Sequence, residues 1–150
     1  MTTIADQAEA MFRMGFNCAQ AVLACCGAGR GLDRPTALRI AQGFGGGMCA
    51  GETCGAVTGA FMAIGLMHAN VTGQDVQAKS KAQDLVLEFR RRFETRHTTV
   101  RCSDLLGVDY ATDEGKRLAR ERGLFKTLCP KFVHDAAEIT EQLLSQETRT

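Results

Sequence analysis

The amino-acid sequence predicts an all-α fold, a single compact bundle of five to seven helices formed by residues 1–150 as one domain. Three observations support this prediction. Apolar residues recur at three- and four-residue steps along most of the chain, which is the period of an amphipathic helix. No run of β-branched residues alternates with polar ones. No repeat, linker or low-complexity segment divides the chain.

The N-terminal part of the chain predicts a long helix followed by a short one. An apolar stripe over residues 4–26 predicts one helix of roughly six turns, ended by Gly27 as a C-terminal cap. Asp33 is the expected N-cap of a short helix that continues through Ile40, with Pro35 in its first turn.

The middle of the chain predicts a glycine-rich loop before a central buried helix. The glycine-dense residues 43–51 are expected to be irregular. From Cys54 to about residue 70 the side chains are small and apolar, so this helix would let neighbouring backbones approach closely. The same small-residue helix could serve a homodimer as readily as a core, and the sequence does not fix the oligomeric state.

The C-terminal half predicts one long helix, two short segments and a final helix. Thr72 and Asp75 indicate the start of the long helix, which is expected to end near His97. The later segments are expected to begin, in chain order, at Cys102 (closed by Gly107), Thr112 and Cys129–Pro130.

Composition argues against several classes of function. Eighteen Lys and Arg against 17 Asp and Glu leave a net charge of +1, which does not favour nucleic acid or a membrane surface as a partner. The most apolar stretch, residues 60–69, is well short of the ~20 residues that a membrane span needs. The N-terminus lacks the features of a secretory signal, so we expect a cytoplasmic protein.

Seven cysteines are unusual in a chain long enough to fold without covalent cross-links. In a reducing compartment, several cysteines indicate metal binding or redox chemistry more often than disulfides. Cys25 and Cys26 continue the first apolar stripe and are expected to be core residues. The chain has no C-x-x-C pair, and Cys49 and Cys54 are separated by four residues, so no thioredoxin-type motif or zinc knuckle is present.

Cys54, Cys102 and Cys129 each stand where irregular chain turns into a predicted helix. Free N–H groups and the helix dipole at such positions stabilise a thiolate, the form of cysteine that binds metals and attacks disulfides. These three cysteines are therefore the candidates for redox chemistry, and any shared site must be assembled from distant segments.

Three sequence blocks and two later cysteines carry a resemblance to a known family. The blocks are Phe16-Asn17-Cys18-Ala19-Gln20-Ala21-Val22, Gly43-Phe44-Gly45-Gly46-Gly47 and Glu52-Thr53-Cys54-Gly55-Ala56-Val57-Thr58-Gly59-Ala60, followed by Cys102 and Cys129. Over nearly its whole length the chain resembles the redox-active proteins named for their C_GCAxxG_C_C cysteine pattern. That pattern has a glycine before the central cysteine, whereas here Thr53 precedes Cys54 and Gly55 follows it.

The resemblance implies four functional cysteines in a small helical domain, namely Cys18, Cys54, Cys102 and Cys129. A similar domain in split-Soret cytochromes is associated with an iron–sulfur cluster. We therefore expect these four thiolates to be metal ligands that bind an iron–sulfur cluster, most simply 2Fe–2S. Its expected role is electron transfer or redox sensing, with an electron-transfer protein as partner.

Three other interpretations use the same cysteines. In a metal-free thiol–disulfide protein, two of them would cycle between thiol and disulfide. In a structural zinc domain, all four would close a tetrahedral shell without redox change. In an inert helical bundle, they would be buried apolar side chains. The sequence assigns no enzymatic reaction.

Two further features have simpler interpretations. Residues 43–51 lack the Gly-Lys-Ser/Thr ending of a phosphate-binding loop, so we expect them to pack against the cysteine site. Arg90, Arg91 and Arg92, with Arg96, His97 and Arg101, form a basic run. It is expected to be a solvated helix face, and the alternative is a docking face for an acidic redox partner.

Overall fold

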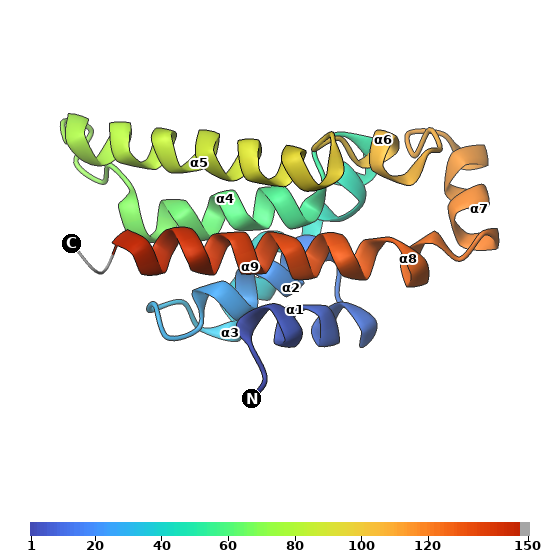
Figure 1. Cartoon of the computed structure of the whole chain (residues 1–150), viewed down its shortest axis with the longest axis horizontal. Helices are drawn as coiled ribbons and strands as arrows, with labels where there is room; N and C mark the ends of the chain where they lie inside the picture. The colour runs from blue at the N-terminus through green and yellow to red at the C-terminus, as the bar shows by residue number, and fades with distance from the viewer. Residues whose placement is uncertain (148–150) are drawn as a thin grey trace.

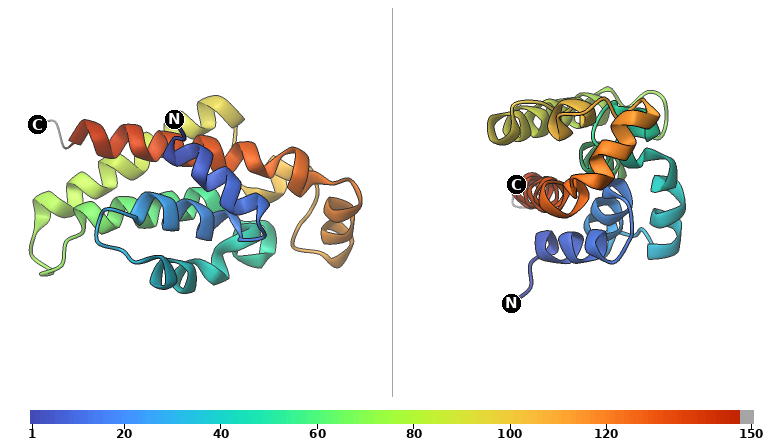
Figure 2. Two further views of the ribbon diagram at one scale, coloured as in Figure 1. Left: turned by 90° about the horizontal axis from the view of Figure 1, so that it is seen from below. Right: turned by 90° about the vertical axis from the view of Figure 1, so that its right-hand side faces the viewer.

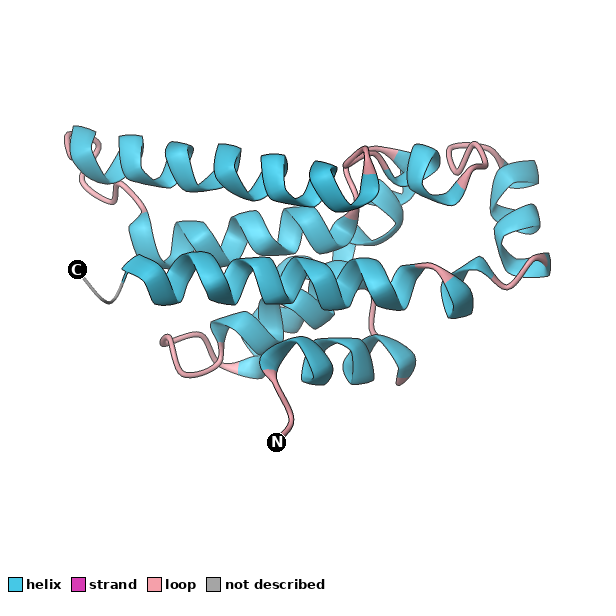
Figure 3. Cartoon of the chain, viewed as in Figure 1, coloured by secondary structure: helices cyan, strands magenta, loops and turns pink. Residues whose placement is uncertain are grey.

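A computed structural model describes residues 1–147 and confirms the all-α fold class (Figures 1 and 3). These residues contain no β-strand, and only one isolated antiparallel bridge joins Thr53 to Arg101. The helices, in chain order, are α1 (Ile4–Arg13), α2 (Cys18–Gly27), α3 (Arg34–Ala41), α4 (Gly55–His68), α5 (Val76–His97), α6 (Cys102–Leu106), α7 (Asp113–Glu121), α8 (Leu124–Thr127) and α9 (Cys129–Glu147), with a 3₁₀ turn η1 (Gln42–Phe44) and a π-type turn η2 (Gly47–Gly51) between α3 and α4.

The expected single helix over residues 4–26 is wrong, because the chain breaks between α1 and α2. Gly15 lies in the break with a φ of 112°, a backbone conformation that favours glycine. Asn17 begins α2, since its side-chain oxygen accepts the Gln20 N–H at 2.9 Å and the Gln20 side chain accepts the Asn17 N–H at 3.0 Å. This reciprocal capping box places Cys18 at a helix start rather than within a helix.

Most other expected boundaries are confirmed. Asp33, Asp75 and Thr112 are the N-caps of α3, α5 and α7, and each side chain accepts a backbone N–H three residues later. The unpredicted helix is α8, a single four-residue turn that is too short to show a helical period. The break before α2 and this extra turn bring the described residues to nine α-helices instead of five to seven.

In Figure 1, α9 crosses the view in front of α2, with α4 and α5 above it and α1 and α3 below it. Helix α2 packs directly against α4, and the left view of Figure 2 shows α7 standing at one end of the molecule. The largest side chains of the core are fully buried and include Phe89, Phe93, Leu23, Ile64 and Ile139. Burying each such side chain contributes about 1.5–3 kcal/mol. Cys25 and Cys26 are also buried in this core, as predicted.

Close packing of α2 on α4 depends on two glycines of α4. A Cβ at Gly59 would lie 2.8 Å from the Ala19 carbonyl oxygen, and one at Gly55 would lie 3.1 Å from the Ala19 backbone nitrogen. The expectation that small residues allow close backbone approach is therefore confirmed, and this approach brings the start of α4 beside the start of α2. None of the helices in residues 1–147 combines the length and the apolar character needed to cross a membrane.

The basic run on α5 is matched by carboxylates. Arg90 pairs with Glu94 at 2.7 Å, and Arg91 and Arg92 both pair with Glu88, at 2.6 and 2.8 Å. Ion pairs between exposed side chains contribute little to stability, but here they leave the face without a strong excess of positive charge. The arrangement agrees with a solvated helix face.

Candidate functional site

Four helix starts surround one cavity with a volume of about 390 Å³. Cys18, Cys102 and Cys129 are the first residues of α2, α6 and α9, and Cys54 is the N-cap of α4. All four cysteines line the cavity, although they come from widely separated parts of the chain. In Figure 1 the starts of α4, α6 and α9 lie toward the end of the bundle that carries α7.

Three of the four side chains are almost fully shielded from solvent. The exposed fractions of Cys54, Cys102 and Cys129 are 5%, 8% and 6%. Cys18 is half-buried, and Cys49, which also lines the cavity, is exposed. Three of the four proposed ligands are therefore shielded from solvent, whereas Cys18 and Cys49 are more accessible.

Backbone hydrogen bonds across the isolated bridge hold two of the cysteines in register. The Cys54 N–H donates to the Val100 carbonyl at 2.8 Å, and the Cys102 N–H donates to the Glu52 carbonyl at 2.6 Å. The two cysteines therefore start their helices from one short antiparallel contact. Their relative position is set by backbone rather than by side chains.

The four sulfurs line one cavity but do not form a tight cluster among the described residues. Among residues 1–147, no three of them lie within 4.8 Å of one another. Two sulfurs bound to one tetrahedral zinc ion are only ~3.8 Å apart, as follows from a Zn–S bond of about 2.3 Å. The cavity therefore presents a wider set of donors than a single-ion shell.

Burial raises the pKa of all four thiols, to about 12 for both Cys102 and Cys129 and well above the ordinary value for Cys18. For Cys18, the charges of the other three cysteines raise the pKa further. The expectation that helix starts would lower these pKa values is wrong, because desolvation outweighs the helix dipole here. Four thiolates cannot share this cavity unless a cation compensates their charge.

Backbone N–H groups offset part of the rise in the pKa of two of these thiols. Hydrogen bonding from the Gly46 N–H lowers the pKa of Cys18, and hydrogen bonding from the Ala56 and Val57 N–H groups lowers that of Cys54. These N–H groups favour negative charge on sulfur, so they are placed to stabilise cysteines that act as ligands.

The glycine-rich segment forms a wall of the cavity, as expected. Gly46, Met48 and Cys49 have φ values of 63°, 55° and 63°, so the segment contains a left-handed turn that includes two non-glycine residues. Such a conformation costs about 1–2 kcal/mol for each non-glycine residue. A Cβ at Gly45 would lie 2.6 Å from the Asn17 Cβ, which shows how closely this segment approaches the start of α2.

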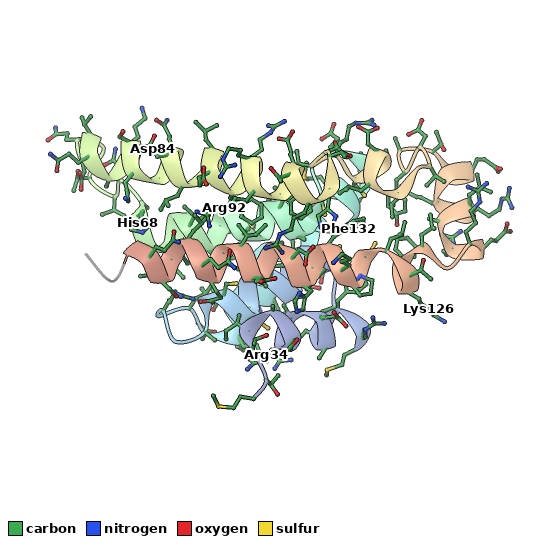
Figure 4. The ribbon with its side chains drawn as sticks, viewed as in Figure 1. Arg34, His68, Asp84, Arg92, Lys126 and Phe132 are labelled. Atoms are coloured by element: carbon green, nitrogen blue, oxygen red, sulfur yellow. The ribbon has the colours of Figure 1, made fainter. Side chains whose placement is uncertain are left out.

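The rest of the wall is mainly apolar and aromatic. Phe132 of α9, labelled in Figure 4, lines the cavity together with Phe12 and Phe125. Tyr110 and Lys116 also line it, and neither was among the candidates from the sequence, because a single tyrosine and a single lysine have no diagnostic spacing. No Asp or Glu of the described residues belongs to the lining.

No curated protein and no solved structure is a significant match to the chain. A protein family described as "Putative redox-active protein (C_GCAxxG_C_C)" matches residues 16–143, which include all four cavity-lining helix-start cysteines. The match covers most of the sequence, and the chain therefore belongs to this C_GCAxxG_C_C family of redox-active proteins.

Proposed function

We propose that this protein binds an iron–sulfur cluster, most simply 2Fe–2S, through Cys18, Cys54, Cys102 and Cys129, and that it serves in electron transfer or redox sensing. The observation that carries the proposal is the convergence of these four cysteines, from four different helix starts, on one largely apolar cavity. Membership of a redox-active family supports it.

The donor set fits an iron–sulfur cluster. Four cysteine thiolates are the usual ligands of a 2Fe–2S cluster, and soft sulfur ligands without carboxylates select against magnesium and calcium. Among the described residues no three of the four sulfurs lie within 4.8 Å of one another, a looser arrangement than the shell of a single zinc ion. A structural zinc site is therefore the less well supported use of the same ligands.

A bound cluster would supply one-electron transfer. The chain's own contribution is to hold the four sulfurs on rigid helix starts and to direct the N–H groups of Gly46, Ala56 and Val57 toward two of them. The absence of side chains at Gly45, Gly46 and Gly55 lets backbone approach the sulfur side of the cavity. The aromatic side chains Phe12, Phe125 and Phe132 make much of the rest of the lining apolar.

A metal-free thiol–disulfide cycle is less well supported. Such a cycle needs an accessible thiolate at neutral pH. Here Cys54, Cys102 and Cys129 are buried and burial raises the pKa of each thiol, so they are protonated and shielded in the absence of a cation.

Anaerobic purification followed by absorption spectroscopy and iron and sulfide analysis tests the proposal. We expect a coloured protein with about two iron and two sulfide per chain for a 2Fe–2S cluster. Serine substitution of any of the four cysteines should lower the iron content. The matched controls Cys25→Ser and Cys26→Ser, which change core cysteines outside the cavity, should retain it.

Other outcomes would contradict the proposal. A colourless protein without iron, even after reconstitution with iron and sulfide under reducing conditions, would exclude a cluster. One zinc per chain that iron and sulfide cannot replace would indicate the structural zinc domain. A reversible disulfide between two cavity cysteines in graded glutathione buffers, in iron-free protein, would indicate the thiol–disulfide cycle.

A further inference from the structure

The wall of the cavity has a second polar part besides the cysteines, formed by Tyr110 and Lys116. Tyr110 is the only tyrosine of the chain. It follows α6, and Lys116 lies in the first half of α7. The two residues therefore come from the segment between Cys102 and Cys129. These two cysteines are the last of the four along the chain.

Tyr110 is held firmly in the wall. Its backbone N–H donates to the Ser103 hydroxyl at 3.0 Å, and its ring packs edge-to-face on Phe125 with centroids 5.8 Å apart. Gly46 lies so close that an added Cβ would be 2.6 Å from the ring atom Cε2. Among the described residues, the Tyr110 hydroxyl has no hydrogen-bond partner.

The pKa of the Tyr110 hydroxyl is raised by its surroundings. Burial raises the pKa of Tyr110 first, and the charges of Cys102, Cys129 and Cys18 raise it further. The phenol lines the same cavity as the four proposed ligands. A phenol that keeps its proton is a hydrogen-bond donor.

Among residues 1–147, Lys116 is the only cation that lines the cavity. Its ammonium nitrogen lies 5.6 Å from the centroid of the Tyr110 ring, in a cation–π contact. Within residues 1–147 it forms no ion pair, in contrast to Arg90, Arg91 and Arg92, which are all paired with glutamates. A half-buried cation without a carboxylate partner suits a site that carries negative charge of its own.

We propose that Tyr110 and Lys116 raise the reduction potential of the group that the four cysteines hold, Tyr110 as a hydrogen-bond donor and Lys116 as a fixed positive charge. This inference rests on the proposed function. Reduction adds one electron to a centre that is already negative, so a nearby cation and a nearby donor stabilise the reduced form more than the oxidised form. Both are positioning residues, since neither is a proposed ligand.

The test compares reduction potentials of the reconstituted protein and its variants by anaerobic titration followed in visible absorption. Tyr110→Phe removes only the hydroxyl, Lys116→Met removes only the charge, and Lys116→Arg keeps the charge. Lys126→Met is the matched control, because Lys126 is exposed on α8 and points away from the bundle in Figure 4.

We expect Tyr110→Phe and Lys116→Met to lower the potential, while Lys116→Arg and Lys126→Met stay near the wild-type value. A tenfold change in the preference for the reduced form corresponds to about 59 mV for a one-electron couple. Iron content and thermal unfolding midpoints close to those of the wild type would show that the ligand set and the fold are intact.

Three results would overturn the inference. If the wild-type protein binds no redox-active group, the proposed function fails and the inference fails with it. If the wild type binds a cluster but Tyr110→Phe and Lys116→Met leave its potential unchanged, the inference alone fails. If Lys126→Met lowers the potential as much as Lys116→Met, the effect is one of net charge and not of the cavity wall.

Discussion

The side-chain amide of Asn17 donates a 2.9 Å hydrogen bond to the backbone carbonyl of Gln42. Asn17 is also the N-cap of α2, so one side chain begins the helix that carries Cys18 and ties it to the end of α3. The same residue lines the cavity. Local capping and the assembly of the site are therefore linked through one amide group.

We expect Asn17→Ala to lower the free energy of unfolding by about 1–2 kcal/mol, because it removes the cap and also the bond to Gln42. Urea denaturation followed by circular dichroism measures the change. Thr3→Ala is the matched control, since the exposed Thr3 forms the equivalent capping box at the start of α1. Thr3→Ala should lower the free energy of unfolding by less than Asn17→Ala does and should leave the metal content unchanged. An equal fall in the free energy of unfolding in both variants would contradict a special role for Asn17.

Two glycines of α4 are expected to respond in opposite ways to alanine. A Cβ at Gly55 would lie 2.9 Å from the Phe44 carbonyl oxygen and 3.2 Å from the Cys18 Cβ, so Gly55→Ala should push the elements apart and cost about 1–3 kcal/mol. A Cβ at Gly65 meets no atom within 4 Å, so Gly65→Ala should raise the free energy of unfolding by up to about 1 kcal/mol through helix propensity. Thermal and urea denaturation of both variants would show whether the signs differ.

Cys49 has a φ of 63°, a value that glycine adopts without strain. Cys49→Gly should therefore raise the free energy of unfolding by up to about 1 kcal/mol, whereas Cys49→Ala keeps the strained conformation and should not. Both variants should retain the iron content of the wild type, because Cys49 is not a proposed ligand. Loss of iron from both would show that this exposed thiol is required.

Asp135 of α9 is expected to make stability depend on pH. Burial alone would raise the pKa of this carboxyl, but the 2.8 Å hydrogen bond from His97 and the charges of Lys131 and Arg96 outweigh burial and hold the pKa below its usual value. A carboxyl with a lowered folded-state pKa stabilises the fold above its unfolded pKa of about 3.9, and this stabilisation is lost as pH falls through the folded-state pKa.

Asp135→Asn should therefore lower the free energy of unfolding at pH 7 by about 1.5–3 kcal/mol, with a difference from wild type that shrinks below about pH 4. Denaturation curves over pH 3 to about 7 measure this difference. Asp104→Asn is the control, because Asp104 is exposed and its pair with Arg101 at 3.2 Å should contribute less than about 1 kcal/mol. A constant difference at all pH values would exclude the carboxylate as its cause.

Local signals in the sequence predicted the helix class and most helix starts, because a cap such as Asp75 or Thr112 acts within three residues of itself. They missed the break at Gly15, since the apolar stripe continues from α1 into α2 and conceals the change of helix axis. The capping box of Asn17 and Gln20 was the signal that could have revealed it.

The four cysteines could be selected from the sequence, but their arrangement around one cavity could not be derived from it. Local periods describe single helices, whereas this arrangement depends on how α2, α4, α6 and α9 pack against one another. Burial also reversed the expected effect of the helix starts on thiol pKa, because desolvation is a property of the assembled fold. The same reason explains why Tyr110 and Lys116 could not be recognised.

The distribution of the four cysteines along the chain has a consequence for biosynthesis. The earliest begins α2, and the last begins α9. A growing polypeptide therefore lacks the complete set of donors until the residues of α9 have been synthesised and α9 has packed against α1, α2 and α4. Any group that requires all four sulfurs can be completed only after Cys129 has been synthesised, and a chain truncated before α9 lacks one of the four proposed ligands.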